Sequence, residues 1–427
     1  TNKTLHAFAV AYAPAILRIG GTAEDCLTYV GFGDDAQGVR DTPFPHCGTV
    51  NASSFAAVMD WGQSAGLKMQ WGLNHLNRTS SGGWNADSAK GLLEAAQKKG
   101  YLHSISLANE PDLDPRKSSV IVSATQLAKD YDTLRSLVDS IWGVGNAPFL
   151  VGPDIAYNNT YLDEFASALS VYSNVSGATG HFYYLNGKTA TVADFLKPET
   201  YDKLWGATSG ILEGAKKLPG GPRWGMLDET ASAYGGGAAG VSDRYVAALV
   251  WLDKIGWCAH TGIKWVARQS FNGGAYALIH EHTGNPTPSY FASLLWKKVM
   301  GQRVLAVHGQ GTPNNALRAY AHCAASGNGD VSILAINLYN STLSITNTLL
   351  NTTTSPTSTS LYNLTPSIPA NVSSMDMNLN NKTLSAPNAQ LPPLDPITIQ
   401  GQASITLLPY TAAFYIFHGV NAPACST

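Results

Sequence analysis

Apolar positions over about the first 300 residues follow two alternating patterns. Short runs that are apolar on both faces predict buried strands. Between them lie segments whose apolar residues recur at helical spacing, such as 54–66 and 123–142. The predicted strands are 15–21, 67–74, 104–110, 148–154, 178–185, 223–229 and 263–270. Strands and helices alternating at this spacing predict a parallel sheet of the (β/α)8 TIM barrel class.

The sheet predicted in this way is one strand short of a closed barrel. We count seven strands where a barrel of this class has eight, and the segment 1–14 ahead of them has the pattern of a helix. An open barrel would leave an unpaired strand edge. We therefore expect the first strand to come from residues ahead of Thr1 or from a separate segment or chain.

The pattern changes after about Gly301, where β-rich runs are separated by Asn, Gly, Pro, Ser and Thr. Such runs predict a C-terminal antiparallel β-sandwich. We predict a catalytic barrel domain at 1–300, lacking its first strand, and a sandwich domain at 301–427. The low-complexity stretch 352–360 predicts a glycosylated or flexible loop on the sandwich.

Composition narrows the class of protein. Charged residues make up 13% of the chain, hydrophobic residues 44%, and the net charge is −2. This balance is typical of a well-buried globular protein, and it favours neither nucleic acid nor an anionic membrane surface as a partner. The densest apolar run, 245–252, is far shorter than the ~20 residues that a membrane-spanning helix needs. We expect it to be a buried helix.

Ten Asn-x-Ser/Thr sequons favour a secreted, N-glycosylated protein, or one of a lysosome-like or vacuole-like compartment. They begin at Asn2, Asn51, Asn77, Asn158, Asn174, Asn340, Asn351, Asn363, Asn371 and Asn381. The five cysteines fit two bridges and one free thiol. We predict Cys26–Cys47, which would close a short loop, and Cys323–Cys425, which would hold the C-terminal segment. Cys258 would then be an inert buried thiol.

Two of the predicted strands finish on glutamate: Glu110 in "ANEP" and Glu229 in "LDET". In a (β/α) barrel the side chains at the carboxyl ends of strands point into the active site. Taken alone, Glu110 fits a strand-end carboxylate that caps the next helix. The pair instead matches glycoside hydrolysis, in which one carboxyl protonates the leaving oxygen and the other attacks or stabilises the anomeric carbon.

Longer motifs bring out a resemblance to heparanase and the plant heparanase-like proteins of glycoside hydrolase family 79. The chain contains "LRIGGT", "WGLNHLNR", "ANEPD", "HFYYLNGKTAT" and the long block from "DETASAYGGGA" to "LDKIG". The resemblance covers nearly the whole chain and implies a retaining double displacement. It makes Glu110 the acid/base, Glu229 the nucleophile and Asn109 a ligand of the sugar 2-hydroxyl.

The same resemblance implies a uronic acid in the glycone subsite. Its carboxylate would be bound by the Tyr234 hydroxyl and the Gly235 and Gly236 amides, with Tyr276 as a further donor. Amide donors bind an anion without adding a full charge. Without the resemblance, "GGG" would indicate no more than a flexible turn.

Four more residues fall on site-lining positions of the family: His181, Tyr183, Lys188 and Gln269. Lys188 stands where heparanases have arginine, so a planar two-bonded contact is lost. For His181 and Tyr183 the alternative is ordinary barrel packing.

Departures from the family bear on the substrate. The stretches 41–60 and 154–165, which correspond to the basic clusters beside the heparanase cleft, contain no Lys or Arg. A polysulfated chain needs several such residues to neutralise it. We therefore expect glucuronides with a neutral remainder, such as glucuronic acid on arabinogalactan side chains, rather than heparan sulfate.

We expect no cofactor and no metal, because "HEH" at 280–282 lacks other nearby ligands at a suitable spacing. The leading interpretation is a retaining exo-β-glucuronidase. One alternative is an endo-β-glucuronidase that acts on heparan sulfate or related chains. An alternative of another class is a non-catalytic carbohydrate-binding glycoprotein. Both glutamates stand within intact motifs, which argues against that last reading.

Overall fold

The computed structural model describes residues 2–32, 48–221, 223–308, 315–345, 354–401 and 404–426. The chain forms two compact units that alternate along the sequence. Unit 1 consists of Thr1–Phe182, Gly206–Thr230 and Ile263–Ala267. Unit 2 consists of Tyr183–Trp205, Ala231–Gly262 and Arg268–Thr427. The domain boundary at 300/301 stays a prediction, and each unit is described by itself below.

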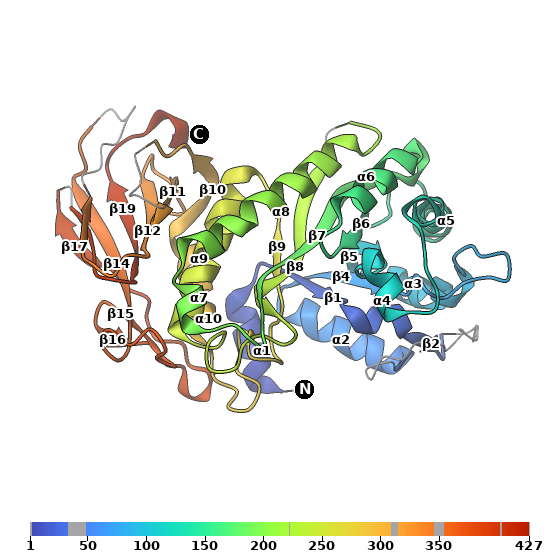
Figure 1. Cartoon of the computed structure of the whole chain (residues 1–427), viewed down its shortest axis with the longest axis horizontal. Helices are drawn as coiled ribbons and strands as arrows, with labels where there is room; N and C mark the ends of the chain where they lie inside the picture. Colours follow the sequence, from blue (N-terminus) through green and yellow to red (C-terminus); the bar gives the residue numbers. More distant parts are fainter. Residues whose placement is uncertain are drawn as a thin grey trace. The chain divides into compact units, whose positions relative to one another are not determined.

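A parallel seven-stranded sheet contains one strand for each of the seven predicted strands, in the order of the chain, and forms a nearly closed barrel (Figure 1). Its strands are β1 (Ile16–Ile19), β4 (Lys68–Leu73), β5 (Leu102–Leu107), β6 (Phe149–Ile155), β7 (Val175–Asn186), β8 (Trp224–Tyr234) and β9 (Val266–Arg268). Ile16 pairs with Lys68, and Ile105 pairs with both Trp71 and Leu150. Each strand is thus followed along the chain by its neighbour in the sheet, as in a singly wound barrel. The predicted fold class is confirmed.

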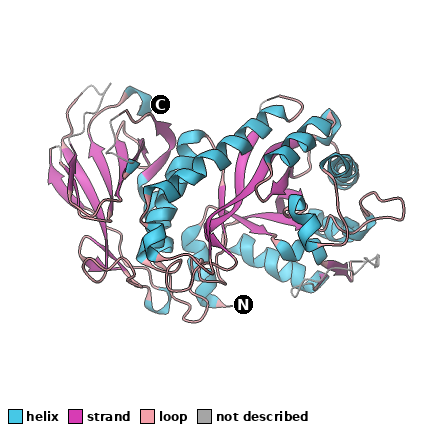
Figure 2. Ribbon diagram, viewed as in Figure 1, coloured by secondary structure: helices cyan, strands magenta, loops and turns pink. Residues whose placement is uncertain are grey.

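Helices separate these strands in the sequence (Figure 2). They are α1 (Lys3–Tyr12), α2 (Ala52–Ser64), α3 (Asp87–Lys99), α4 (Asp114–Lys117), α5 (Ala124–Trp142), α6 (Asn159–Ala168), α7 (Val192–Phe195), α8 (Pro198–Lys217), α9 (Tyr245–Thr261) and α10 (Pro288–Val299). Several begin where a side chain caps the first turn. Asn2, Asn51 and Asn158 each accept backbone N–H groups in this way.

The helices of unit 1 pack on the sheet and on one another, with α2 against β4, α6 against β6 and α5 against both α3 and α6. Tyr131 of α5 is fully buried and joins two strands, because its hydroxyl accepts from the Leu107 N–H at 3.1 Å and donates to the Val151 carbonyl at 2.7 Å. A Cβ on Gly152 would lie 1.9 Å from that hydroxyl. Only glycine lets α5 approach the sheet so closely.

Unit 2 contains an eight-stranded sheet. Seven of its strands follow the order β10-β11-β12-β19-β14-β15-β16, and the eighth, β17, pairs with β14. These strands are β10 (Met300–Leu305), β11 (Leu317–Ala324), β12 (Val331–Asn337), β14 (Ser358–Pro366), β15 (Met377–Leu379), β16 (Lys382–Thr383), β17 (Ile397–Gln400) and β19 (Ala412–His418). Neighbouring strands in this sheet pair antiparallel. A small sheet in unit 2 pairs β13 (Leu343–Ile345) with β18 (Ile405–Leu407). Another, in unit 1, pairs β2 (Thr28–Val30) with β3 (Thr49–Asn51).

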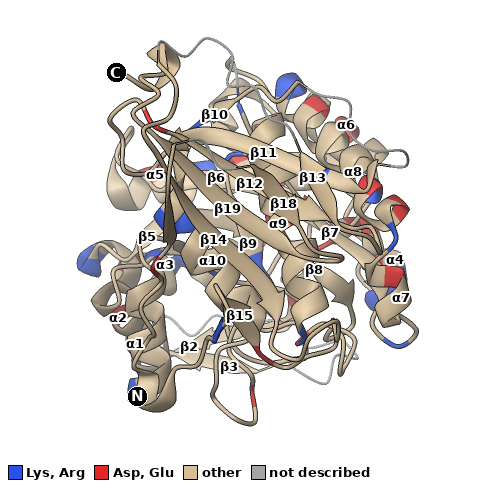
Figure 3. Ribbon diagram, turned by 90° about the vertical axis from the view of Figure 1, so that its left-hand side faces the viewer, with Lys and Arg blue, Asp and Glu red and all other residues tan. Residues whose placement is uncertain are grey.

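The centre of the unit 2 sheet is apolar. Strands β12, β14 and β19 carry no Lys, Arg, Asp or Glu, and they are tan throughout in Figure 3. Phe417, Leu407 and Val420 are fully buried in a cluster to which β12, β18 and β19 contribute. Burial of such side chains is the main stabilising term for a sheet of this kind.

One of the two predicted disulfides is present, and the other includes a cysteine outside the described residues. Cys323 and Cys425 are bonded, which links β11 to the C-terminal segment. The predicted partner of Cys26, Cys47, lies outside the described residues. Cys258 is a buried free cysteine, as expected. Among the described residues, no helix has the length and apolar character needed to cross a membrane.

The 323–425 link predicts a measurable loss of stability when it is removed. The two cysteines are 102 residues apart, so replacing both with alanine should lower the free energy of unfolding by about 2–5 kcal/mol in urea titrations. As a control, Cys258→Ala cuts no covalent link and should cost only about 1 kcal/mol. A double variant as stable as the parent protein would contradict the prediction.

Candidate active site

Glu110 lies just beyond a strand, in a turn with unusual backbone angles. Strand β5 ends at Leu107, and Ala108 and Glu110 follow with φ of 97° and 49°. The Glu110 N–H donates to the Asp154 carbonyl at 2.8 Å. Its side chain makes no capping bond to the 3₁₀ helix Pro111–Leu113. Instead one carboxylate oxygen lies 3.1 Å from His181 Nδ1. The helix-capping alternative is therefore wrong.

Glu229 lies within a strand rather than at its end, because β8 continues five residues beyond it to Tyr234. The residue is buried, with 9% of its surface exposed. Its carboxylate accepts from the Arg18 guanidinium at 2.9 Å. Gly21 lies beside it; a Cβ there would be in ordinary contact with the Glu229 carboxylate at 3.5 Å, so it is the φ of 88° that favours glycine at this position.

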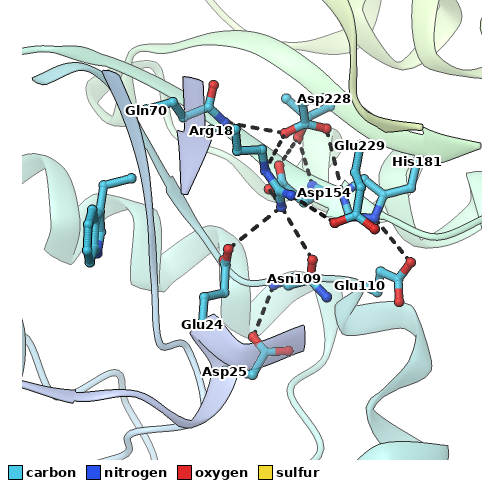
Figure 4. A network of polar contacts seen from close by, with 12 residues as sticks. Arg18, Glu24, Asp25, Gln70, Asn109, Glu110, Asp154, His181, Asp228 and Glu229 are labelled. Atoms are coloured by element: carbon cyan, nitrogen blue, oxygen red, sulfur yellow. Dashed lines mark hydrogen bonds and ion pairs between the residues drawn. The ribbon is translucent and has the colours of Figure 1, made fainter. Parts of the chain in front are cut away.

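The fold brings the two predicted glutamates face to face (Figure 4). One oxygen of each carboxylate and one nitrogen of His181 all lie within 4.8 Å of one another. Asn109 joins this group, since its amide oxygen accepts from Arg18 at 3.3 Å. Four of the predicted site residues, from β7, β8 and the turn after β5, thus converge in unit 1.

Arg18 of β1 is the centre of the site and was not among the predicted residues. Its guanidinium lies 2.9 to 3.7 Å from four carboxylates, as Figure 4 shows. These belong to Glu24, Asp154, Asp228 and Glu229. Burial alone would lower the pKa of Arg18, but the surrounding carboxylates raise it well above its ordinary value. The guanidinium is therefore always charged.

Burial shifts two of those acids towards their protonated forms. It raises the pKa of Glu24 well above its ordinary value, despite the opposing effect of Arg18. Burial, followed by the nearby Asp154, does the same for Asp228. Neither oxygen of Glu24 has a hydrogen-bond partner among the described residues. This shift lessens the negative charge that the Arg18 guanidinium has to balance.

Glycines in the "LRIGG" motif make this arrangement sterically feasible. A Cβ on Gly20 would lie 2.5 Å from a Glu24 carboxylate oxygen and 2.8 Å from Arg18. A Cβ on Gly72 of β4 would lie 1.9 Å from that carboxylate. The signal that could have pointed to Arg18 is an arginine two residues before a pair of glycines at a strand end.

His181 connects the acid/base candidate to the buried acids. Its Nδ1 faces Glu110, and its Nε2 lies 3.8 Å from Asp228. Burial would lower its pKa, but Glu229, a hydrogen bond to Glu110 and the charge of Glu110 raise it to about 9. A protonated imidazole therefore stands beside Glu110 at neutral pH.

Two sets of side chains have the geometry of metal ligands. Each offers ligand atoms within 4.8 Å of one another: Glu110, His181 and Glu229, and Asp154, His181 and Asp228. In both sets Arg18 already forms an ion pair with a member. A fixed guanidinium at that distance repels a second cation. Arg18 therefore disfavours a metal ion at either set of side chains.

The other predicted residues lie in unit 2. Tyr183 and Tyr276 have ring centroids 6.4 Å apart. The Gly187 N–H donates to the Tyr234 carbonyl at 3.0 Å. Lys188 and Tyr234 are exposed, and Gln269 is half-buried.

The predicted glycine turn adopts a conformation that only glycine takes readily. Gly235, Gly236 and Gly237 have φ of 74°, 91° and 85°. The Ala275 N–H donates to the Gly236 carbonyl at 2.7 Å. A Cβ on Gly237 would approach the Tyr276 nitrogen to 2.7 Å. The backbone angles favour glycine at all three positions, and at Gly237 the close approach of Tyr276 excludes a side chain as well.

Comparison with known proteins places this site in a family. The N-terminal domain model of glycosyl hydrolase family 79 matches residues 1–256. Mouse heparanase is 34% identical over 389 residues, which cover 88% of this chain and 71% of that protein. The chain belongs to glycosyl hydrolase family 79. The expectation drawn from the motifs is confirmed.

Other relatives of this chain carry names that differ in the activity they state. Human inactive heparanase-2 is 31% identical, over 88% of this chain and 66% of that protein. Baicalin-β-D-glucuronidase of Scutellaria baicalensis is 26% identical, over 97% and 82%. Among solved structures, a 4-O-α-L-rhamnosyl-β-D-glucuronidase from Fusarium oxysporum superposes with a TM-score of 0.66 at 17% identity, over 97% of this chain and 91% of that one. At that identity the likeness supports the fold alone.

The contacts of Arg18 predict a large and pH-dependent effect of its removal. Arg18→Met leaves buried carboxylates without their counter-charge, which should cost about 3–5 kcal/mol of unfolding free energy at pH 7. The cost should shrink towards pH 5. Without the cation, burial disfavours the charged forms of the carboxylates that Arg18 had balanced, so protonation at lower pH relieves the penalty.

Urea titrations of Arg18→Met at pH 5 and pH 7 measure this effect. The control is Arg223→Met, since the Arg223 guanidinium makes an exposed hydrogen bond with Asn174 at 3.1 Å. The control should lose less than about 1 kcal/mol at both pH values. A pH-independent loss in Arg18→Met would contradict the assignment of its partners.

The raised pKa of His181 predicts a second pH effect. A folded-state pKa of about 9 against about 6.5 unfolded gives stabilisation that is complete below pH 6.5 and lost as pH rises to about 9. His181→Gln should therefore flatten the fall of unfolding free energy between those pH values, by at most about 3 kcal/mol. An unchanged slope in the variant would show that His181 is not protonated in the folded protein.

Proposed function

We propose that this member of family 79 is a retaining β-glucuronidase, and one observation carries the proposal. Oxygens of Glu110 and Glu229 lie within 4.8 Å of each other. Retaining glycosidases hold their two carboxyl groups about 5–5.5 Å apart, whereas inverting ones leave about 6.5–9.5 Å for a water molecule. The short separation supports direct attack by a carboxylate.

The surroundings of the two glutamates support distinct roles. Glu229 has the Arg18 guanidinium at 2.9 Å, which stabilises a carboxylate and suits a nucleophile. Glu110 does not share that guanidinium; it bonds instead to the His181 imidazole at 3.1 Å, and 18% of its side chain is exposed. A partly exposed carboxyl beside an imidazole can exchange protons with solvent, as an acid/base must.

The proposed reaction has two steps. First, a Glu229 oxygen attacks the anomeric carbon while Glu110 gives its proton to the leaving oxygen, so the glycosidic C–O bond breaks. Then Glu110 takes a proton from water, the water oxygen attacks the anomeric carbon, and Glu229 is released. Asn109, held by Arg18 at 3.3 Å, would bind the 2-hydroxyl, a contact that strengthens in the transition state.

We further propose that the turn of unit 2 recognises the uronate. Three successive glycines with positive φ can present backbone N–H groups to an anion. Tyr234, exposed at 50%, and Tyr276 would add hydroxyl donors. Tyr183, Lys188 and Gln269, also of unit 2, would complete the subsite, as in the family resemblance.

The proposed substrate is a weakly charged glycan that ends in β-linked glucuronic acid, cleaved by exo action. The stretch 154–165 carries no Lys or Arg, which disfavours a polysulfated chain. The relative named as a baicalin glucuronidase supports the exo alternative, and the heparanases support endo action on heparan sulfate or related chains. A non-catalytic glycan-binding role has a precedent in the relative named as inactive.

Two further proposals concern the setting of the enzyme. In the described residues, β1 and β9 each pair with one neighbour in the sheet, so we propose that an eighth strand from a separate segment fits between them. We also propose a secreted or vacuole-like, N-glycosylated protein. The exposed sequons at Asn340, Asn371 and Asn381 suit glycosylation, whereas Asn77 is only 4% exposed.

Substitution of the proposed nucleophile tests the mechanism. Glu229→Gln should reduce kcat on a chromogenic β-glucuronide by a factor on the order of 10⁴ or more, the scale expected when a covalent nucleophile is lost. Substrate binding should persist. The matched control is Glu213→Gln, whose side chain is 58% exposed in a surface ion pair and should leave kcat unchanged.

Products distinguish the alternatives. Release of the β-anomer first, followed by NMR, supports retention, and release of the α-anomer would refute it. Dye release from the aryl glucuronide without shortening of a heparan sulfate chain supports exo action, whereas chain shortening supports endo action. Binding of both compounds without turnover would leave the glycan-binding role.

A further inference from the structure

A second buried charge network lies beside the one around Arg18. His75, which follows β4, bridges two aspartates: its Nδ1 lies 2.8 Å from Asp25, and its Nε2 lies 3.0 Å from Asp114. All three side chains are fully buried. Lys117 of α4 adds a second cation, 3.0 Å from the other oxygen of Asp25. The network thus joins the helical turn 22–26, the end of β4 and α4.

This network holds the backbone of Asn109 at both of its polar groups. The Asn109 N–H donates to Asp25 Oδ1 at 3.1 Å, the same oxygen that meets His75. The Asn109 carbonyl accepts from the Lys117 ammonium. Asn109 immediately precedes Glu110, so these bonds determine where the chain delivers the Glu110 side chain.

The turn needs such external support. Ala108 and Glu110 have φ of 97° and 49°, and each such conformation costs a non-glycine residue on the order of 1–3 kcal/mol. Neighbouring strands supply two more bonds: the Ala108 N–H donates to the Leu73 carbonyl, and the Glu110 N–H donates to the Asp154 carbonyl. The main chain of Asn109 itself is held by the charged network.

The charges within the network balance. Burial would lower the pKa of His75, but Asp25 and Asp114 raise it to about 9, so the imidazole is a cation at neutral pH. Asp25 and Asp114 then face His75 and Lys117. Removal of either cation leaves a buried carboxylate short of a partner, which forces the surrounding chain to rearrange.

We propose that His75 and Lys117 are positioning residues for Glu110, acting through Asp25 and the main chain of Asn109. The proposal rests on the proposed function, since it takes Glu110 as the acid/base. Neither side chain contacts the reacting groups. Their role is to hold a strained turn so that the Glu110 carboxyl reaches the leaving oxygen, and misplacement by about 1 Å is enough to lose much of that catalysis.

The test compares two substrates that differ in their need for an acid. Phenyl β-glucuronide has a poor leaving group and requires proton donation, whereas 2,4-dinitrophenyl β-glucuronide leaves without it. In His75→Gln and Lys117→Met of the full chain, kcat/KM for the phenyl substrate should fall at least about 10-fold more than for the dinitrophenyl substrate, part of the 10²–10⁴ that acid catalysis contributes. Azide, a nucleophile that needs no general base, should raise kcat on the dinitrophenyl substrate in these variants but not in the parent.

Two controls address loss of stability alone. His322→Gln replaces another buried histidine, which bonds to the Gly301 carbonyl in unit 2. Lys217→Met removes another lysine–aspartate pair, with Asp163 at 2.7 Å. Both should leave the ratio of the two kcat/KM values unchanged. If His75→Gln does not fold, Lys117→Met decides, because its side chain is 10% exposed and its loss is better tolerated.

Glu110→Ala serves as the reference for a lost acid/base. If it shows the substrate split and azide rescue while both positioning variants lose activity equally on the two substrates, the network is merely structural and the inference is wrong. Unchanged kinetics in both variants would also overturn it. If Glu110→Ala shows neither effect, the proposed function fails as well, and the inference fails with it.

Discussion

One buried guanidinium organises the active site. Arg18 contacts carboxylates from the turn after β1, from β6 and twice from β8, and it also holds the amide of Asn109. Buried carboxylates at this density would repel one another and favour their protonated forms. Burial raises the pKa values of Glu24 and Asp228, and the Arg18 guanidinium, 2.9 Å from Glu229, stabilises the charged form of that carboxylate. Gly20 and Gly72 leave the space that this arrangement occupies.

The two glutamates depend on different supports, and this difference supports the proposed division of their chemistry. Glu229 is part of a strand, so its direction is set by the sheet, and Arg18 sets its charge. Glu110 lies in a turn whose backbone is strained, so its direction has to be imposed from outside. His181 touches its carboxylate, and the Asp25–His75–Lys117 network holds the preceding residue. Separate environments for two carboxyls are how one site keeps one of them basic and the other able to carry a proton.

The proposed recognition of the uronate depends on local backbone geometry rather than on buried charge. Gly235, Gly236 and Gly237 form a turn that other residues would strain, and the segment around Tyr276 packs against it. The turn was predicted from its family motif, since the three glycines alone indicate only a flexible turn. The ion network of unit 1 has no such contiguous motif and was not predicted.

The sequence by itself determined the barrel strands, since burial on both faces leaves an apolar run that needs no partner to be recognised. It also determined the pair Glu110 and Glu229, through their positions relative to those strands and through family motifs. Only the tertiary structure decided that Glu110 turns to His181 instead of capping a helix, because that contact joins residues 71 apart. The same holds for Arg18 and Glu229, which are 211 residues apart, and for the network of His75. Charge partners of this kind depend on where separate strands place their side chains, and no periodicity along the chain records that.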